Sequence, residues 1–594
     1  MAPPVSTSPL EAVSTASLMA SDQARAERTV EELEAASKSK GRKSAALSKV
    51  LKDDRAIALL RALAGNSPFL ARLLVREAEI LPALLSDHAS QSLETLLQAC
   101  RTDMQAAQDQ ATLMEAARTA KRRVALLTAA ADVSTAWPLE SVTHALTVLA
   151  DTVIESTCQW LLRRSAMAGD IKLANEQVPT TGSGLIVIAM GKHGAFELNY
   201  SSDIDIIVFY EPDGLEFAKG IDPGSFFVRL TRDLVKVLQE PTGGGYVFRT
   251  DLRLRPDAGS TSIAISAQAA EIYYETMGQN WERAAMIKAR ECAGDLAAGR
   301  RLLDMLEPFV WRRYLDFAAI DDIHSLKHQI HAHGGHGAIA IEGHDVKLGR
   351  GGIREIEFFV QIQQLIGGGK SPALRGRATI NMLEALVEEG WVSDQARDDL
   401  RDAYNFLRTL EHRLQMVNDE QTHRMPRNKE GVACIAAFMG FADEEAFRLR
   451  LRTVLETVQQ HYAGLFEHEP SGAQEDEAFV FSGTDNDPAT LRALNDMGFS
   501  GPAAVIDIVR GWHFGRIPAT RAARSRELLT KLTPSLLRAL AAVDNPDQAI
   551  SRFDTFLSGQ PAGVQFFSLL YQNPALIDLL ASMGADPIIP ARRS

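Results

Sequence analysis

Cysteine is scarce in this chain. Only four occur among 594 residues, and they lie far apart: Cys100, Cys158, Cys292 and Cys434. This spacing excludes a disulfide framework and a compact cysteine metal site, which are the arrangements that cysteine-rich domains use for stability. Scattered single cysteines are typical of a reducing compartment, so we expect a cytoplasmic protein.

Positive charge is not in excess either, and long apolar runs are missing. The 63 lysines and arginines are outnumbered by 76 aspartates and glutamates, which gives a formal net charge of −13. Proteins that bind nucleic acids carry a basic surface, which this balance argues against. No apolar stretch is long enough to span a bilayer, and the N-terminus lacks the pattern of a secretory signal. We therefore expect neither nucleic acid nor a membrane among the partners.

The chain is long and rich in hydrophobic residues. With 46% hydrophobic residues in 594 positions, the chain should form roughly two to four domains. Apolar residues at three- and four-residue steps predict helices over most of it, and a few short runs predict strands, so the predicted fold class is α+β, mostly α. The predicted organisation is an arm, mobile or helical (1–52), a helical subdomain (53–165), a catalytic domain (166–345), a second helical domain (346–468), a linker (469–488) and a C-terminal helical region (489–594).

The stretch from 184 to 212 carries the clearest chemical pattern. Two apolar runs, 185–190 and 206–209, predict buried strands. Asp203 and Asp205 stand at the start of the second strand, and residues two apart on a strand project to the same side. Neighbouring carboxylates repel each other unless a cation lies between them, and Mg²⁺ prefers carboxylate oxygens together with substrate phosphates.

A glycine-rich turn separates the two predicted strands. Gly191 and Gly194 lie in this turn, and glycine lets backbone N–H groups approach a phosphate closely. The turn and the aspartate pair together predict metal-assisted chemistry on a nucleotide phosphate. A surface Asp-x-Asp without a metal is the alternative interpretation.

A row of charged residues follows in the segment 246–256. If this segment is a strand, Arg249, Asp251, Arg253 and Arg255 share one face. Planar guanidinium groups suit phosphate oxygens, and Asp251 lies among them as an acid in a row of arginines. A solvated edge strand with internal ion pairs is the alternative.

Two further clusters are open to two interpretations each. Gly349, Gly351 and Gly352 predict a tight turn before a helix that starts near Ile353, with Lys347, Arg350 and Arg354 around it. This arrangement would make either an anion site or a well-capped elbow between domains. In the segment HAHGGHG, His331, His333 and His336 could bind a transition metal, but the surrounding glycines favour a loop.

The spacing of Met190-Gly191-Lys192 before Asp203-Ile204-Asp205-Ile206 resembles the signature of the polymerase-β-like nucleotidyltransferase superfamily, with Lys192 in place of the usual small residue. Four further motifs follow in order up to residue 426: FRTDLRLRP, WERAAMIKARECAGD, VKLGRGGIREIEFFVQ and LEHRLQMVNDEQTHRMP. With these, the chain resembles the N-terminal, adenylyl-removing part of the bifunctional glutamine synthetase adenylyltransferase/adenylyl-removing enzymes.

This resemblance implies a polymerase-β-like domain with a small mixed sheet, flanked by helical domains. It implies phosphorolysis of adenylylated glutamine synthetase by inorganic phosphate, which gives ADP and is regulated by the uridylylated PII signal-transduction protein. Mg²⁺ would be held by the catalytic residues Asp203, Asp205 and Asp251. The implied phosphate- and nucleotide-binding residues are Gly191, Lys192, Gly194, Ser201, Ser202, Arg249, Arg253 and Arg255.

Two rival functions remain open at this point. The same carboxylates would serve an ATP-dependent transferase that adds AMP to glutamine synthetase. Alternatively, the fold could serve as a non-catalytic module that binds a nucleotide or PII.

A short internal similarity bears on the length of the protein. The segment 69–85 is echoed by 566–580, close to the end of the chain. We therefore expect an N-terminal piece of a protein that continues into a second nucleotidyltransferase unit, with two unrelated amphipathic helices as the alternative.

Overall fold

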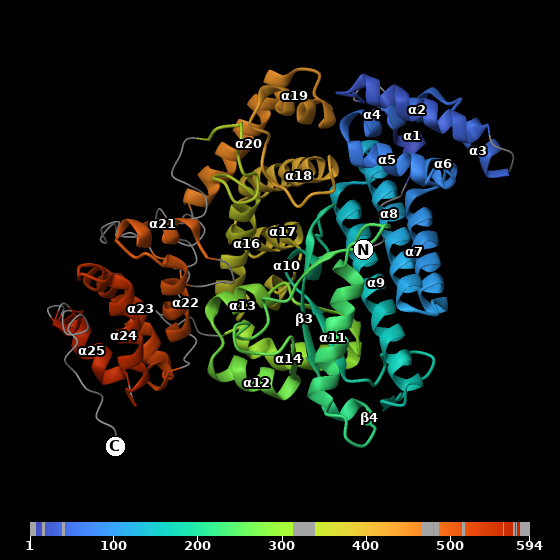
Figure 1. Cartoon of the computed structure of the whole chain (residues 1–594). Helices are drawn as coiled ribbons and strands as arrows, with labels where there is room; N and C mark the ends of the chain where they lie inside the picture. Colours follow the sequence, from blue (N-terminus) through green and yellow to red (C-terminus); the bar gives the residue numbers. More distant parts are fainter. Residues whose placement is uncertain are drawn as a thin grey trace. The chain divides into compact units, whose positions relative to one another are not determined.

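Helices dominate the structure, and small sheets complete it, so the predicted class α+β, mostly α, is confirmed (Figure 1). The computed structural model describes residues 7–14, 18–38, 42–312, 339–464, 479, 481, 486–513, 517–561, 563–573, 576–577 and 579–581. The histidines at 331, 333 and 336 and most of the predicted linker lie outside the described residues.

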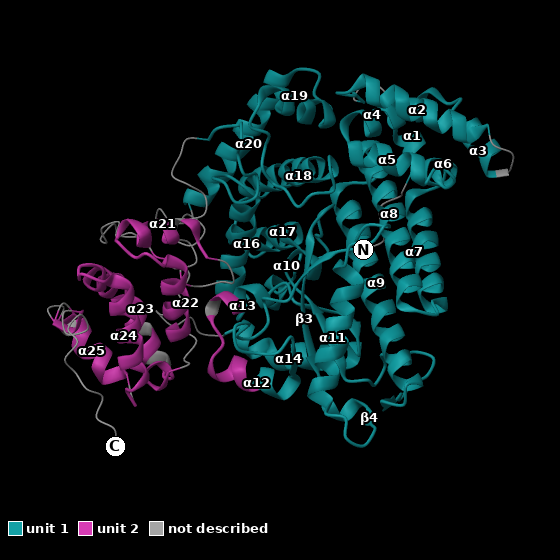
Figure 2. Cartoon of the chain, viewed as in Figure 1, with its two compact units in different colours: residues 1–271, 284–312, 337–466 teal, residues 272–283, 313–336, 467–594 magenta. Residues whose placement is uncertain are grey.

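The chain divides into two compact units (Figure 2). The first comprises residues 1–271, 284–312 and 337–466, and the second comprises residues 272–283, 313–336 and 467–594.

The first part of the chain is helical from α1 to α9. The leucine periodicity seen in the sequence faces a core, since Leu59, Leu60 and Leu63 are fully buried. Side chains of Asp53 and Ser67 accept backbone N–H groups at the starts of α4 and α5, which is why these helices begin there. The bounds are α1 Pro9–Ala12, α2 Gln23–Ser37, α3 Arg42–Val50, α4 Asp54–Asn66, α5 Pro68–Arg76, α6 Leu81–Ser86, α7 Ala89–Ala106, α8 Gln110–Val133 and α9 Leu139–Met167.

A five-stranded mixed sheet follows these helices. Its order is β5-β3-β2-β7, and β6 also pairs with β3. Strand β3 runs antiparallel to β2 and parallel to β5 and β6, and β7 is antiparallel to β2. The bounds are β2 Leu185–Ala189, β3 Asp203–Tyr210, β5 Arg249–Asp251, β6 Ala264–Ser266 and β7 Arg290–Gly294; β1 Ile171–Lys172 and β4 Glu216–Phe217 form a separate pair.

The two apolar runs predicted as strands are β2 and β3. All five residues of β2 are buried, and apolar side chains of both strands share one core with α4 to α9. Helices α7, α8 and α9 pack against one another (Figure 1), and α9 also packs on β7. The helical segment and the sheet are therefore stabilised by a common core.

The prediction of one strand through residues 249–255 is wrong. Strand β5 ends at Asp251, and residues 253 and 254 form a turn. The Asp251 carboxylate accepts the backbone N–H of Arg253 at 2.7 Å. Such a local side-chain bond bends the chain and competes with strand pairing. Arg253 and Arg255 therefore do not lie on the strand beside Arg249.

Further helices lie between and after the strands, and those from residue 353 to 464 surround a second apolar core. Residues 272–283, which include parts of two of these helices, belong to the second unit. The predicted helix start near Ile353 is confirmed, because α16 begins there after the tight glycine turn. The bounds are α10 Gly191–Gly194, α11 Pro223–Gln239, α12 Ala267–Thr276, α13 Asn280–Met286, α14 Leu296–Val310, α16 Ile353–Gly367, α17 Thr379–Glu388, α18 Asp394–Met416, α19 Lys429–Phe438 and α20 Glu444–Gly464.

The second unit contains a core of its own, centred on residues such as Trp512 and Phe567. Its helices are α21 Pro488–Asp496, α22 Pro502–His513, α23 Ala523–Ala541, α24 Pro546–Ser558 and α25 Val564–Gln572. Across the residues that the structure describes, no helix combines the length and apolar character needed to cross a bilayer.

Candidate active site

Three carboxylates lie close together at the start of β3, where β5 pairs with it. Asp203 and Asp205 lie two apart on β3, and the parallel register places Asp205 opposite Asp251 of β5. One oxygen of each carboxylate lies within 4.8 Å of those of the other two. The structure thus brings together the three acids that the sequence singled out.

The surroundings of Asp205 disfavour its charged form. Burial, followed by the charges of Asp203 and Asp251, raises its pKa to about 7, while Lys347 and Lys192 oppose the shift. A cation between the carboxylates would relieve this repulsion. A donor set made only of carboxylate oxygens fits a hard divalent cation of the Mg²⁺ type.

The raised pKa of Asp205 predicts a pH-dependent instability of the metal-free protein. The folded state keeps a proton that the unfolded chain releases near pH 4, so the associated stability is complete below that pH and is lost as the pH rises to about 7. Asp205→Asn should therefore match the wild type near pH 4 and exceed it by roughly 2–4 kcal/mol near pH 8. Urea unfolding in a chelator at both pH values measures this difference, and an equal gap at both would contradict the assignment.

The glycine turn lies against this carboxylate. Gly191 opens α10 with φ +52, and a Cβ added there would lie 3.1 Å from Asp205 Oδ2. A Cβ on Gly194 would lie 1.9 Å from the carbonyl oxygen of Lys288. Both positions therefore need glycine, the first for conformation and carboxylate space and the second for close backbone packing.

Gly191→Ala should weaken metal binding through crowding of Asp205. The methyl group would press on Oδ2, and we expect the Kd for Mn²⁺ to rise about 10-fold. Gly220→Ala is the matched control, because Gly220 also has positive φ (+92) but nothing lies within 4 Å of its Cβ position. Calorimetric titration with Mn²⁺ compares the two, and an equal effect of both substitutions would assign the loss to backbone strain alone.

The two serines before β3 are held in place by neighbouring side chains. Ser202 donates its hydroxyl to Asp203 Oδ1 at 3.3 Å. Arg249 donates to the carbonyl and hydroxyl oxygens of Ser201 at 2.7 and 2.9 Å, and its guanidinium lies over the ring of Tyr246. Arg249 therefore braces the segment that leads into the aspartate pair.

The other two predicted arginines are also engaged within the protein. Arg253 binds both oxygens of Asp251 through Nε, at 3.0 and 2.9 Å. Arg255 donates to the carbonyl oxygens of Leu252 and Ala258, each at 2.8 Å, and so closes its own loop. The structure leaves no unengaged arginine among the three.

Lys192 points into a buried network of charges that the sequence did not reveal. Its ammonium lies 3.4 Å from Glu357 of α16, and burial lowers its pKa to about 8. Lys288 bridges Glu357 and Glu197 at 3.6 and 2.8 Å. On α18, Arg408 donates to Asn199 Oδ1. The paired residues lie 69 to 209 positions apart in the sequence, so no local pattern predicts these contacts.

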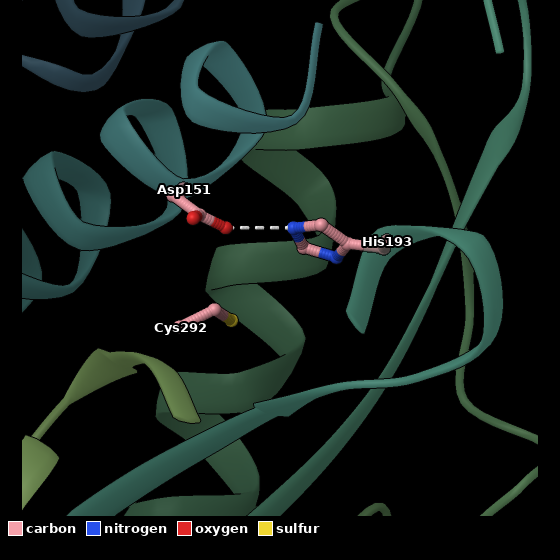
Figure 3. Close-up of side chains that lie close together, drawn as sticks. All are labelled: Asp151, His193 and Cys292. Atoms are coloured by element: carbon pink, nitrogen blue, oxygen red, sulfur yellow. Dashed lines mark hydrogen bonds and ion pairs between the residues drawn. The ribbon is translucent and has the colours of Figure 1, made fainter. Parts of the chain in front are cut away.

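A second buried cluster anchors the other side of the glycine turn (Figure 3). His193, in the turn, points toward Asp151 of α9, and Nε2 lies 2.8 Å from the carboxylate, with the Cys292 thiol nearby. The three could be metal ligands by distance, but Arg290 already binds both oxygens of Asp151, at 3.0 and 2.9 Å. The cluster therefore ties α9 to the turn that carries Gly191.

Sequence comparisons place the chain among known proteins. Residues 57–305 match the family described as glutamate-ammonia ligase adenylyltransferase, and residues 324–466 match the one described as GlnD PII-uridylyltransferase. The chain is 48% identical over 573 residues to the bifunctional glutamine synthetase adenylyltransferase/adenylyl-removing enzyme of Mesorhizobium japonicum. That match covers 96% of this chain and 58% of the relative.

Relatives with the same name in other bacteria give similar values. The identity is 49% over 522 residues for Rhizobium meliloti, with 87% of this chain and 53% of the relative covered. It is 45% over 568 residues for Bradyrhizobium diazoefficiens, with coverages of 95% and 56%. The chain thus spans little more than half the length of these relatives.

Proposed function

Because the chain belongs to the family of bifunctional glutamine synthetase adenylyltransferase/adenylyl-removing enzymes, we propose that it removes AMP from adenylylated glutamine synthetase by phosphorolysis. The observation that carries the proposal is the cluster of Asp203, Asp205 and Asp251 beside the glycine turn. Its oxygen donors and mutual repulsion fit Mg²⁺, which would offset negative charge on the reacting phosphates when bound.

The proposed reaction is balanced in atoms and charge. An oxygen of hydrogen phosphate attacks the AMP phosphorus, a P–O–P bond forms, and the bond from phosphorus to the tyrosyl oxygen breaks. The tyrosyl oxygen keeps the electron pair and takes up the proton that hydrogen phosphate gives up, so the products are ADP and unmodified tyrosine. The three carboxylates would hold Mg²⁺, and Gly191 would let the backbone approach the AMP phosphate.

The residues just before the aspartate pair favour the proposal of AMP removal over that of AMP addition. The sequence Glu197-Leu-Asn-Tyr-Ser-Ser-Asp203-Ile-Asp205 resembles the adenylyl-removing unit of the family. ATP-dependent addition on the same carboxylates is the alternative, and a non-catalytic nucleotide-binding role is the third possibility. Turnover with phosphate or with ATP separates the first two, and metal-dependent binding without turnover would support the third.

Uridylylated PII is the proposed regulatory partner. The match of residues 324–466 to the PII-uridylyltransferase family supports a link to PII. We also propose the cytoplasm as the compartment, because all four cysteines are free.

The decisive experiment uses the purified chain, adenylylated glutamine synthetase and Mg²⁺, with and without inorganic phosphate. Phosphate-dependent release of ADP, with loss of AMP from the substrate protein, is the expected result. Incorporation of AMP from ATP into unmodified glutamine synthetase, without the phosphate reaction, would replace the proposal with the transferase. Absence of both reactions, also with uridylylated PII, would overturn it.

A further inference from the structure

The proposed reaction needs positive charge beyond the metal ion that the carboxylates would hold. Hydrogen phosphate is a dianion and must approach an anionic diester next to three carboxylates, so a positive side chain has to hold it. Arg249, Arg253 and Arg255 are engaged with protein groups, and Lys192 is paired with Glu357. The phosphate-binding residue must therefore come from another part of the chain.

The turn before α16 lies next to the site. Gly191 touches Asp205 on one side, and the residue after it, Lys192, contacts Glu357 in the second turn of α16. The helix that follows the turn is thus linked to the carboxylates through Lys192 and Gly191. It belongs to the motif with Gly349, Gly351 and Gly352 that the sequence offered as either an anion site or an elbow.

Hydrogen bonds within this turn hold the backbone of Lys347 in place. Its backbone N–H donates to Asp345 Oδ1 at 3.1 Å, and its carbonyl oxygen accepts the N–H of Arg354 at 3.0 Å. A Cβ on Gly351 would lie 2.1 Å from the carbonyl oxygen of Leu455, so the turn packs directly against α20. Lys347 therefore starts from a fixed backbone position.

The ammonium of Lys347 is a cation without a direct partner among the described residues. The side chain is half-buried, whereas Arg350 and Arg354 of the same turn are exposed. Within the described parts of the chain, this ammonium forms no hydrogen bond and no ion pair. Its charge acts on Asp205 and also on the buried carboxylates Glu357 and Glu411, since it opposes the rise in pKa that burial causes at all three.

We propose that the Lys347 ammonium binds the attacking phosphate and, after the reaction, the terminal phosphate of ADP. This inference rests on the proposed function, of which it names the phosphate-binding residue. Lys347 donates hydrogen bonds to non-bridging oxygens of the nucleophile, whereas the three carboxylates would hold the metal. It takes no part in the proton transfer from hydrogen phosphate to the tyrosyl oxygen.

The test compares the KM for inorganic phosphate with the KM for adenylylated glutamine synthetase. Lys347→Met should raise the former about 10- to 100-fold, the loss expected for one charge-assisted hydrogen bond, and leave the latter within about 2-fold. Lys347→Arg should restore part of the phosphate affinity because it keeps the charge. Lys370→Met, an exposed lysine beyond the other end of α16, is the matched control and should behave as wild type. An unchanged phosphate KM in Lys347→Met would overturn the inference.

A second measurement does not depend on the folding of a variant. An amine-reactive reagent is applied to the wild type with and without phosphate and Mg²⁺, or MgADP, and labelling is read by peptide mass spectrometry. Phosphate or ADP should protect Lys347 and not Lys370; equal labelling would overturn the inference. If Lys347 is protected but phosphate yields no ADP, the inference about this lysine stands and the proposed reaction fails.

Discussion

Asp205→Asn is expected to lower phosphate-dependent ADP release about 10³-fold and to leave the fold intact, since one metal ligand is exchanged for a neutral isostere. Asp203→Asn should have a similar effect, because both side chains share one face of β3 and meet Asp251 within 4.8 Å. The initial rate of ADP release at saturating phosphate and Mg²⁺ is the measurement. Near-normal rates in either variant would refute the assignment of the metal site.

The control for these variants lies at the other end of the same strand. Asp213 is an exposed aspartate just after β3, in the 3₁₀ turn Pro212–Gly214, and Asp213→Asn should keep full activity. Mn²⁺ binding, measured on all three variants, shows whether lost activity follows lost metal. A variant that binds metal normally but does not turn over would assign its carboxylate a role other than ligation.

The carboxylate pair could be predicted from sequence because its geometry is local. A spacing of two within a buried strand fixes Asp203 and Asp205 on one side, whatever the rest of the chain does. Asp251 required a parallel pairing between β3 and β5 that only the resemblance to a family suggested. The Asp151–His193 contact depends on the packing of α9 on the sheet, and no periodicity encodes it.

The segment 249–255 shows that one local hydrogen bond can override a strand-like alternation of residues. Residues 249–255 alternate as a strand should, yet the Asp251 side chain captures the N–H of Arg253 and turns the chain. The phosphate-binding role that alternation suggested for Arg253 and Arg255 loses its geometric basis. The proposed phosphate-binding cation, Lys347, comes from a turn 96 residues beyond Asp251 in the sequence.

Arg408→Leu is expected to destabilise the protein by about 3–5 kcal/mol, the cost of leaving a buried charge without its partner. Arg408 is fully buried and donates to Asn199 Oδ1 and to the Glu197 carbonyl oxygen. Its Nε lies 3.5 Å from Glu411, whose two carboxylate oxygens accept no hydrogen bond among the described residues. The free energy of unfolding in urea measures the loss.

The double variant Arg408→Leu/Glu411→Leu separates two contributions to the lost stability: the cost of an unpaired buried charge and the cost of lost packing. Replacing both partners by apolar side chains removes the uncompensated carboxylate, so the double variant should be more stable than Arg408→Leu alone. Arg401→Leu is the control on the same helix; it breaks an exposed pair with Asp398 and should cost less than about 1 kcal/mol. If the double variant were as unstable as the single one, the hydrogen bonds of Arg408 to Asn199 and Glu197, rather than its charge, would hold α18 against the segment that leads into the aspartate pair.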